Sequence, residues 1–410
     1  MIELAALNVI NGCIGMMAHI FVWHTVPEDN MSGIYEQFGV TPGINARGNQ
    51  TLLGGSTPPV EIQEAMDEAM NSGYVVFEEL LRKTGDFIAD TLGTEQAFVT
   101  SGAAAAISLG TAAALAGDDR EKIGLIPDTS SFDRNELVFQ KGHDYTYKRC
   151  FTMAGARLIE VGREDGCTVE ELEAGIGPKT IGIAYYESGQ WGDEWVSLDE
   201  ARALADKHDI RLIVDAAGQI YPLDQFMRVA QTGDVVAFGA KYIGSPHSTG
   251  ICTGRAEFVE SAFQQNFIGF ELAGQKGLTR SYGRPYKTDR GEVIGVAAAL
   301  RRWFTINHED RLAVEDSKRA AFQRGLSGVT GVDVTIPSTP QLGPNVNVMI
   351  HIDNQVSGIA GLEIIKQLEE SPTPIWTRTF DGGKTIPIGV QMLSDEEVET
   401  VIQRIKEIIG

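Results

Sequence analysis

The residues best suited to chemistry are an aspartate and a lysine that each follow an apolar segment. Asp215 ends the run 212–214, and Lys241 follows the apolar segment 234–238 in a turn of small residues. Desolvation in such a turn favours the neutral amine of lysine and makes it a nucleophile able to form a Schiff base. A carboxylate on a neighbouring strand can pair with a protonated pyridine nitrogen. Each residue alone would be an ordinary turn residue or surface charge, but the pair predicts pyridoxal 5′-phosphate as cofactor.

A turn of tiny residues supplies the third element of such a site, a cradle for a phosphate group. The segment 97–100 predicts a short strand that runs into Ser101, Gly102 and Ala103, and small residues continue as a helix to Leu115. Small side chains at a strand-to-helix turn let backbone N–H groups approach an anion, and the helix N-terminus adds partial positive charge. Close packing of this helix on a sheet would need the same residues. Together with the lysine and the aspartate, they favour a phosphate cradle.

Strands and helices alternate through the middle of the chain, which predicts an α/β domain. Apolar strands are expected at 123–127, 136–140, 157–161 and 180–185, and helices at 59–73, 77–92, 145–154, 198–208 and 292–306. Such alternation builds a mostly parallel sheet covered on both faces, and ligands bind at the carboxyl ends of its strands. The lysine, the aspartate and the cradle are all expected at those ends.

The same pattern predicts the domain organisation. We interpret 1–30 as an N-terminal extension, 31–95 as an arm with two helices, 96–306 as the large cofactor-binding domain and 307–410 as a small C-terminal α+β domain. The extension is a start-site artefact or a disordered segment in this interpretation, because Met31 is a natural alternative start. Although 5–26 carries no charged side chain, its polar residues and Glu3 near the start argue against a membrane anchor or a secretory signal.

Composition excludes several classes of function. The chain has 410 residues, 43% of them hydrophobic, which is enough for a large core. With 34 Lys+Arg against 56 Asp+Glu its formal net charge is −22, which opposes nucleic-acid binding. The four cysteines lack CxxC spacing, so neither a disulfide framework nor a metal site is expected. A reducing cytoplasm is the compartment that fits these features.

The order of these motifs resembles the SelA-like family of pyridoxal phosphate-dependent enzymes of fold type I. The resemblance covers residues 35–303 and rests on the segments SGAAAA, VDAAGQ, GAKYIGSPHSTGICTGR and YGRPYK. The family includes L-seryl-tRNA(Sec) selenium transferase and D-glucosaminate-6-phosphate ammonia-lyase. It implies a large domain of the aspartate aminotransferase type with a mostly parallel sheet, plus a small C-terminal α+β domain. It also implies a homodimer or higher homo-oligomer, because such enzymes build each site from two chains.

The resemblance implies a role for each motif residue. Lys241 would hold the cofactor and then act as the base toward the substrate's α-proton, and Asp215 would pair with the pyridine nitrogen. The phosphate would be bound by Ser101, Gly102 and Ala103. His143 would cover the ring face, a role for which Tyr145 competes, and Gln219 would reach the ring hydroxyl.

Substrate recognition is expected to use arginine, which binds a carboxylate or phosphate bidentately. Arg284 in the YGRPYK motif, Arg47 in the arm and Arg378 in the small domain are the candidates. His247, close after Lys241, is expected to point into the site as well.

The predicted function is a lyase that removes an amino or β-substituent from a small amino acid or amino sugar acid. His143, His247 or Tyr242 could protonate the leaving group. Aminotransferase, racemase and aldolase outcomes stay open, because they depend on where acids and bases stand in the pocket.

Two rivals are weighed against this lyase. Transfer of selenium to a tRNA-bound substrate is disfavoured by the acidic charge and by the apolar extension that stands where the transferase has its tRNA-binding region. A non-catalytic partner that keeps only the fold is disfavoured because Lys241 is present.

Overall fold

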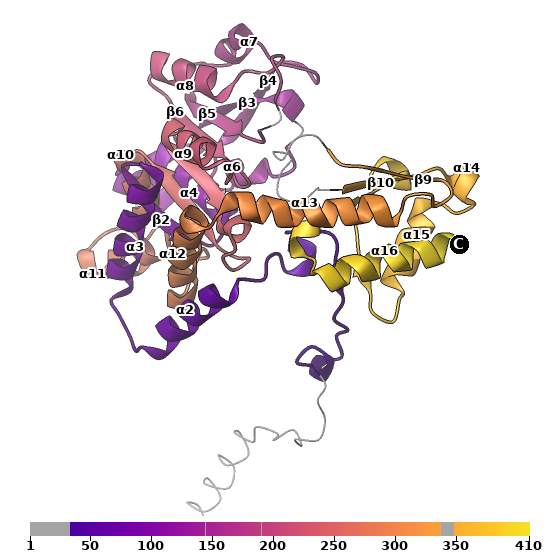
Figure 1. Cartoon of the computed structure of the whole chain (residues 1–410). Helices are drawn as coiled ribbons and strands as arrows, with labels where there is room; N and C mark the ends of the chain where they lie inside the picture. The colour runs from indigo at the N-terminus through magenta and orange to yellow at the C-terminus, as the bar shows by residue number, and fades with distance from the viewer. Residues whose placement is uncertain (1–32, 144, 190, 338–347) are drawn as a thin grey trace, which may run out of the picture.

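The computed structural model describes residues 33–410 except 144, 190 and 338–347. The predicted extension 1–30 lies outside the described residues. Figure 1 shows a large α/β part and, to its right in orange and yellow, a smaller part entered through the long helix α13 (His308–Gly325). Among the described helices, none is long and apolar enough to cross a membrane.

A seven-stranded sheet forms the centre of the large part, in the order β2-β8-β7-β6-β5-β3-β4. Its strands are β2 (Gln96–Thr100), β3 (Glu136–Gln140), β4 (Arg157–Val161), β5 (Thr180–Tyr186), β6 (Arg211–Asp215), β7 (Val235–Gly239) and β8 (Gly250–Gly254). Only β8 runs against its neighbours, β2 and β7. The prediction of a mostly parallel sheet is therefore confirmed.

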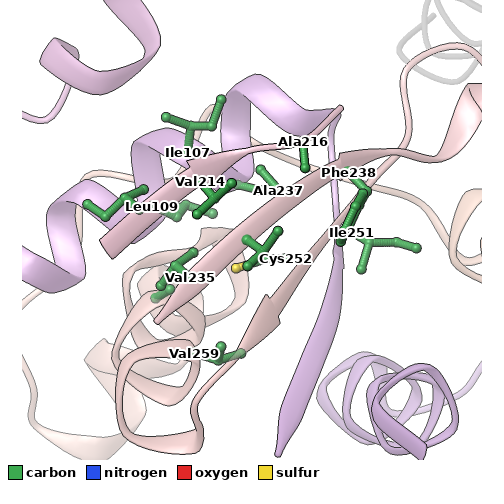
Figure 2. Close-up of a cluster of buried hydrophobic side chains, with 14 of the residues drawn as sticks. Ile107, Leu109, Val214, Ala216, Val235, Ala237, Phe238, Ile251, Cys252 and Val259 are labelled. Atoms are coloured by element: carbon green, nitrogen blue, oxygen red, sulfur yellow. The ribbon is translucent and has the colours of Figure 1, made fainter. Parts of the chain in front are cut away.

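Helices cover both faces of this sheet. They are α2 (Val60–Asn71), α3 (Phe77–Leu92), α4 (Ala103–Ala116), α5 (Arg120–Leu125), α6 (Arg149–Thr152), α7 (Val169–Ala174), α8 (Leu198–Lys207), α9 (Leu223–Thr232), α10 (Ala256–Gln265), α11 (Phe267–Lys276) and α12 (Arg290–Thr305). Helix α4 is buried almost throughout, and Figure 2 shows its Ile107 and Leu109 in the core with Val214 and Val235 of the sheet. A Cβ at Gly110 would lie 2.6 Å from a methyl carbon of Val235. The small residues of this helix therefore also serve the close packing that the sequence left open.

The smaller part has its own sheet and core. Strands β9 (Val332–Thr335), β10 (Val348–Ile352) and β12 (Thr385–Ile388) pair antiparallel with β10 in the centre, beside α13, α14 (Asn354–Ser357), α15 (Gly361–Glu369) and α16 (Asp395–Ile409). The N-terminal arm joins this part, because β1 (Ile44–Asn45) pairs parallel with β11 (Ile375–Trp376) and Ile44 and Ala46 are buried in the core. The predicted domain boundaries themselves stay a prediction.

Three predictions of secondary structure are wrong. Residues 123–127 were expected as a strand, yet α5 occupies 120–125 because Asp119 caps it by accepting from the N–H groups of Glu121 and Lys122. The helix expected at 145–154 shrinks to α6, which leaves Tyr145 outside it. Residues 35–56 of the arm, whose many glycines and prolines predict an extended segment without regular structure, contribute β1. The other predicted strands and helices are present, with ends within a few residues.

Candidate active site

The ends of three strands meet at one edge of the large sheet. Thr100, the last residue of β2, pairs with Gly250, which in turn pairs with Gly239 at the end of β7. Asp215 ends β6, the other neighbour of β7, and pairs with Ala237. Because the cradle follows β2 and Lys241 follows β7, the register places the cradle, the aspartate and the lysine at the same edge.

The cradle is an uncapped helix N-terminus. Gly102 precedes α4 with φ +88°, a conformation that favours glycine, and no side chain among the described residues caps the first turn. The Thr100 hydroxyl donates to the Gly102 carbonyl oxygen at 3.0 Å, which steadies the turn. The first N–H groups of α4 therefore stand ready for an anion, and the cradle fits a phosphate group.

Asp215 is buried at the end of β6, with an exposed fraction of 4%. Its Oδ2 accepts a hydrogen bond from the Tyr145 hydroxyl, and its Oδ1 accepts one from the Ala217 N–H at 2.9 Å. Burial raises the pKa of Asp215, because the charged carboxylate loses its hydration, while both hydrogen bonds act in the opposite direction. A buried carboxylate held in this way fits a protonated ring nitrogen.

Lys241 lies in the 3₁₀ turn η4 (Ala240–Ile243), and its Nζ is 5.1 Å from the centre of the Tyr242 ring. Burial lowers the pKa of the Lys241 amine, as the sequence predicted. His247 lies near it, since burial and then the charge of Lys241 lower the pKa of His247. The His247 ring packs on the arm, where a Cβ at Gly55 would lie 1.9 Å from its Nδ1.

His143 lies in an aromatic cluster rather than against Asp215. Its ring stacks on Trp191 with centres 3.9 Å apart and planes 4° apart, and Phe139, Tyr185 and Trp195 surround it. Burial lowers the pKa of His143 to about 3, so the ring is neutral at neutral pH. Its predicted place on the cofactor face stays a prediction, and Tyr145 is the residue that contacts Asp215.

A cavity of about 530 Å³ opens beside Lys241. Gln219 lines it, as do Asn45, Asn49 and Ser56 of the arm. Arg311, Glu315 and Arg319 of α13 also line it, as does Gln391 of the 3₁₀ turn η7 (Val390–Met392). The cavity is large enough for a substrate with several polar groups.

The three predicted substrate arginines lie in different surroundings. Arg378 is half-buried, and burial and then the nearby charge of Arg47 lower its pKa. Arg47 donates to Gln50 Oε1 at 2.6 Å and to the Thr377 carbonyl oxygen at 3.2 Å. Arg284 instead pairs with Glu271 at 2.7 Å, and none of the three arginines is among the residues that line the cavity beside Lys241. Within one chain, the structure therefore brings Arg47 and Arg378 together and leaves Arg284 apart.

Sequence reasoning missed two features of this site. One is the bond between Tyr145 and Asp215, which joins residues 70 positions apart. The other is the charged face of α13, where Arg311 and Arg319 both pair with Glu315. The four-residue spacing of these three residues was a signal for that face.

The sheet order, the lysine after β7 and the aspartate that ends β6 define the class as fold type I, the fold of pyridoxal phosphate-dependent enzymes. No family model matches the sequence. The chain is 27% identical over 384 residues to 5′-C-glycyluridine monooxygenase-decarboxylase from a Streptomyces species, covering 92% of each chain. It is also 27% identical over 382 residues to D-glucosaminate-6-phosphate ammonia lyase from Salmonella typhimurium, covering 92% of this chain and 97% of that one.

Solved structures agree on the fold. A structure of D-glucosaminate-6-phosphate ammonia-lyase matches with a TM-score of 0.75 at 24% identity, covering 93% of this chain and 99% of that one. A cysteine desulfurase from Thermococcus onnurineus matches with a TM-score of 0.55 at 19% identity, over 90% of this chain and 94% of that one. The predicted fold class and the resemblance to SelA-like enzymes are confirmed. Both sequence relatives are enzymes, so the prediction of an enzyme is confirmed too.

Proposed function

We propose that the chain is a pyridoxal phosphate-dependent lyase of the ammonia-lyase type that acts on an amino sugar acid or a small amino acid. The observation that carries this proposal is the meeting of Lys241, Asp215 and the phosphate cradle at one sheet edge. The similarity to D-glucosaminate-6-phosphate ammonia lyase, at 27% identity over 92% of the chain, supports the reaction type.

The cofactor, when bound, draws electrons from the substrate's α-carbon and so makes its proton removable. The N–H groups at the start of α4 would hold the phosphate, and Asp215 would hold the ring nitrogen. Lys241 would take the α-proton onto Nζ, a role that suits an amine whose pKa is lowered by burial. Arg378 and Arg47 would bind the substrate's carboxylate.

Loss of a leaving group requires an acid. His143 is a poor donor, because burial lowers its pKa to about 3 and the neutral ring has no readily lost proton. His247 and Tyr242 both lie near Lys241, as its charge effect on His247 and its approach to the Tyr242 ring indicate. Because burial and the charge of Lys241 lower the pKa of His247 as well, we assign the acid role to the Tyr242 hydroxyl rather than to His247.

A second candidate reaction is oxidative decarboxylation. The Streptomyces relative named as a monooxygenase-decarboxylase is also 27% identical over 92% of the chain, so identity does not separate the two chemistries. Release of ammonia without uptake of oxygen would favour the lyase, whereas oxygen uptake with release of carbon dioxide would favour the second reaction.

The proposal also covers the oligomeric state, the compartment and the partners of the enzyme. We expect a homodimer or higher homo-oligomer in the cytoplasm. We do not expect tRNA as a partner, because the net charge of −22 repels it.

The proposal is tested by the absorption spectrum of the protein supplied with pyridoxal phosphate. We expect a band near the visible range that is absent in Lys241→Ala and kept in Lys207→Ala, since Lys207 is an exposed lysine paired with Glu173 on α7. Amino sugar acids and D- and L-amino acids are then added while ammonia is measured. A protein that binds no cofactor, or binds it equally well without Lys241, would refute the proposal.

A further inference from the structure

Tyr145 reaches the carboxylate that is proposed to hold the ring nitrogen. Among the described residues, Asp215 accepts one side-chain hydrogen bond, from the Tyr145 hydroxyl, and one backbone bond, from Ala217. The two bonds end on different carboxylate oxygens. Each oxygen has two lone pairs, so the carboxylate can accept a further donor without giving up either bond.

The hydrogen-bond donors that stabilise the charged form of Asp215 are themselves neutral. Burial alone would favour the protonated acid, and the hydrogen bonds from Tyr145 and Ala217 oppose that effect. Two further ionisable groups face the carboxylate, the Tyr186 hydroxyl and the Cys150 thiol. Burial raises the pKa of Tyr186, and that of Cys150 to about 11, so both are neutral at neutral pH.

The ring of Tyr145 is itself fixed in place. Its exposed fraction is 5%, and it stacks on Tyr186 with centres 4.5 Å apart. Phe139 and Phe151 lie 6.1 and 6.0 Å away. Burial and the charge of Asp215 raise the pKa of Tyr145 far above its usual value, so the hydroxyl keeps the proton that it donates.

We propose that Tyr145 is a positioning residue for the cofactor, whose hydroxyl keeps Asp215 charged and oriented toward the ring nitrogen. The inference rests on the proposed function, because the nitrogen is supplied by pyridoxal phosphate. If Tyr145 acts through Asp215, its loss should weaken the binding only of a ligand whose ring carries this nitrogen. If Tyr145 merely fills space, its loss should weaken the binding of any ligand of the same shape equally.

The test compares two ligands of the same shape on the cofactor-free full chain. One is pyridoxal phosphate, and the other is its carba-analogue, in which a C–H replaces the ring nitrogen. Equilibrium dissociation constants are measured for the natural protein, for Tyr145→Phe and for the control Tyr185→Phe. Tyr185 is a matched control, because it is equally buried and donates its hydroxyl to the Val196 carbonyl oxygen at 3.0 Å instead of to Asp215.

We expect Tyr145→Phe to bind pyridoxal phosphate about ten-fold more weakly, the size of one lost bond to a charged group, and the carba-analogue as well as before. Tyr185→Phe should keep the natural ratio between the two ligands. Equal losses for both ligands in Tyr145→Phe would overturn the inference, because they would indicate packing alone.

A second variant covers a failure of Tyr145→Phe to fold. Placing 3-fluorotyrosine at position 145 keeps the ring and strengthens the donor, so the preference for pyridoxal phosphate over the carba-analogue should rise. An unchanged preference would overturn the inference. A natural protein that binds neither ligand would refute the proposed function itself, an outcome distinct from binding of both ligands without an effect of Tyr145.

Discussion

Gly250 at the start of β8 packs so tightly on the cradle that a Cβ at this position would lie 2.4 Å from the carbonyl carbon of Gly102 and 2.6 Å from the Ala103 nitrogen. These are backbone atoms, which cannot turn aside as a side chain can. The position of the first N–H groups of α4 is therefore set by a residue on the neighbouring strand.

Replacing Gly250 by alanine should push the cradle away from its bound phosphate. We expect at least ten-fold weaker binding of pyridoxal phosphate and almost no change for pyridoxal, which lacks the phosphate group. Equilibrium dialysis measures both. Gly177→Ala is the control, because a Cβ there would meet no atom within 4 Å. Equal losses for both ligands would show that the substitution acts on the whole site.

In the cofactor-free protein, the buried amine of Lys241 should lower the free energy of unfolding at neutral pH relative to a variant that lacks this amine. The folded state lowers the pKa of Lys241 below 10.5 by burial, so unfolding takes up a proton between the two pKa values. Stability should therefore rise with pH across that window. We expect Lys241→Met to raise the melting temperature at pH 7, and the gain to shrink as the pH approaches 10.5. A gain that does not change with pH would contradict this explanation.

Arg378 should matter more to substrate binding than Arg284 if each site uses the arginines of its own chain. Loss of a charge-assisted pair costs roughly 1.5–3 kcal/mol, so Arg378→Met should raise KM about 10- to 100-fold. Arg284→Met should change KM little, because Arg284 is already paired with Glu271, whereas Arg378 lies near Arg47 and Tyr242. KM is measured by steady-state kinetics with a compound from which the natural protein releases ammonia. The reverse order of effects would indicate that Arg284 serves the site of a partner chain.

Ile44 should anchor the arm to the small C-terminal part. It is 6% exposed and lies in the core that contains Ile350 and Ile386. Ile44→Ala should cost about 2–4 kcal/mol of unfolding free energy, as large-to-small changes in a core do. Denaturation in urea measures the loss, and Val40→Ala, at a position that is 53% exposed, should have almost no effect. Equal effects of the two variants would show that the arm contributes no core packing.

Local signals explain why much of the fold could be predicted from the sequence. The helix at 77–92 was predicted to the residue, because its apolar spacing is regular and Gly93 ends it in the left-handed conformation. The strand expected at 123–127 was wrong because a short apolar run does not distinguish strand from helix. The capping aspartate at 119, just before that run, was the stronger signal.

The candidate site divides in the same way. The location of Lys241, Asp215 and the cradle at one edge could be predicted, because each stands at the end of its own strand and strand ends in such sheets meet at one edge. The bond from Tyr145 to Asp215 could not, because it depends on how a loop 70 residues earlier folds over that edge. The contribution of α13 to the cavity could not be predicted either, because the position of this helix depends on how it packs in the core of the smaller part.

The arm described above has a mechanical consequence. Its residues 44–46 are fastened to the small C-terminal part, while Asn49 and Ser56, a few residues later, form one wall of the cavity beside Lys241. The Ser56 hydroxyl also donates to the Ser245 carbonyl oxygen at 2.7 Å, which ties the other end of this stretch to the large part. A rotation of the small part would therefore pull on a chain held at both ends and change the width of the cavity. Any such rotation would therefore also change the opening through which a substrate enters.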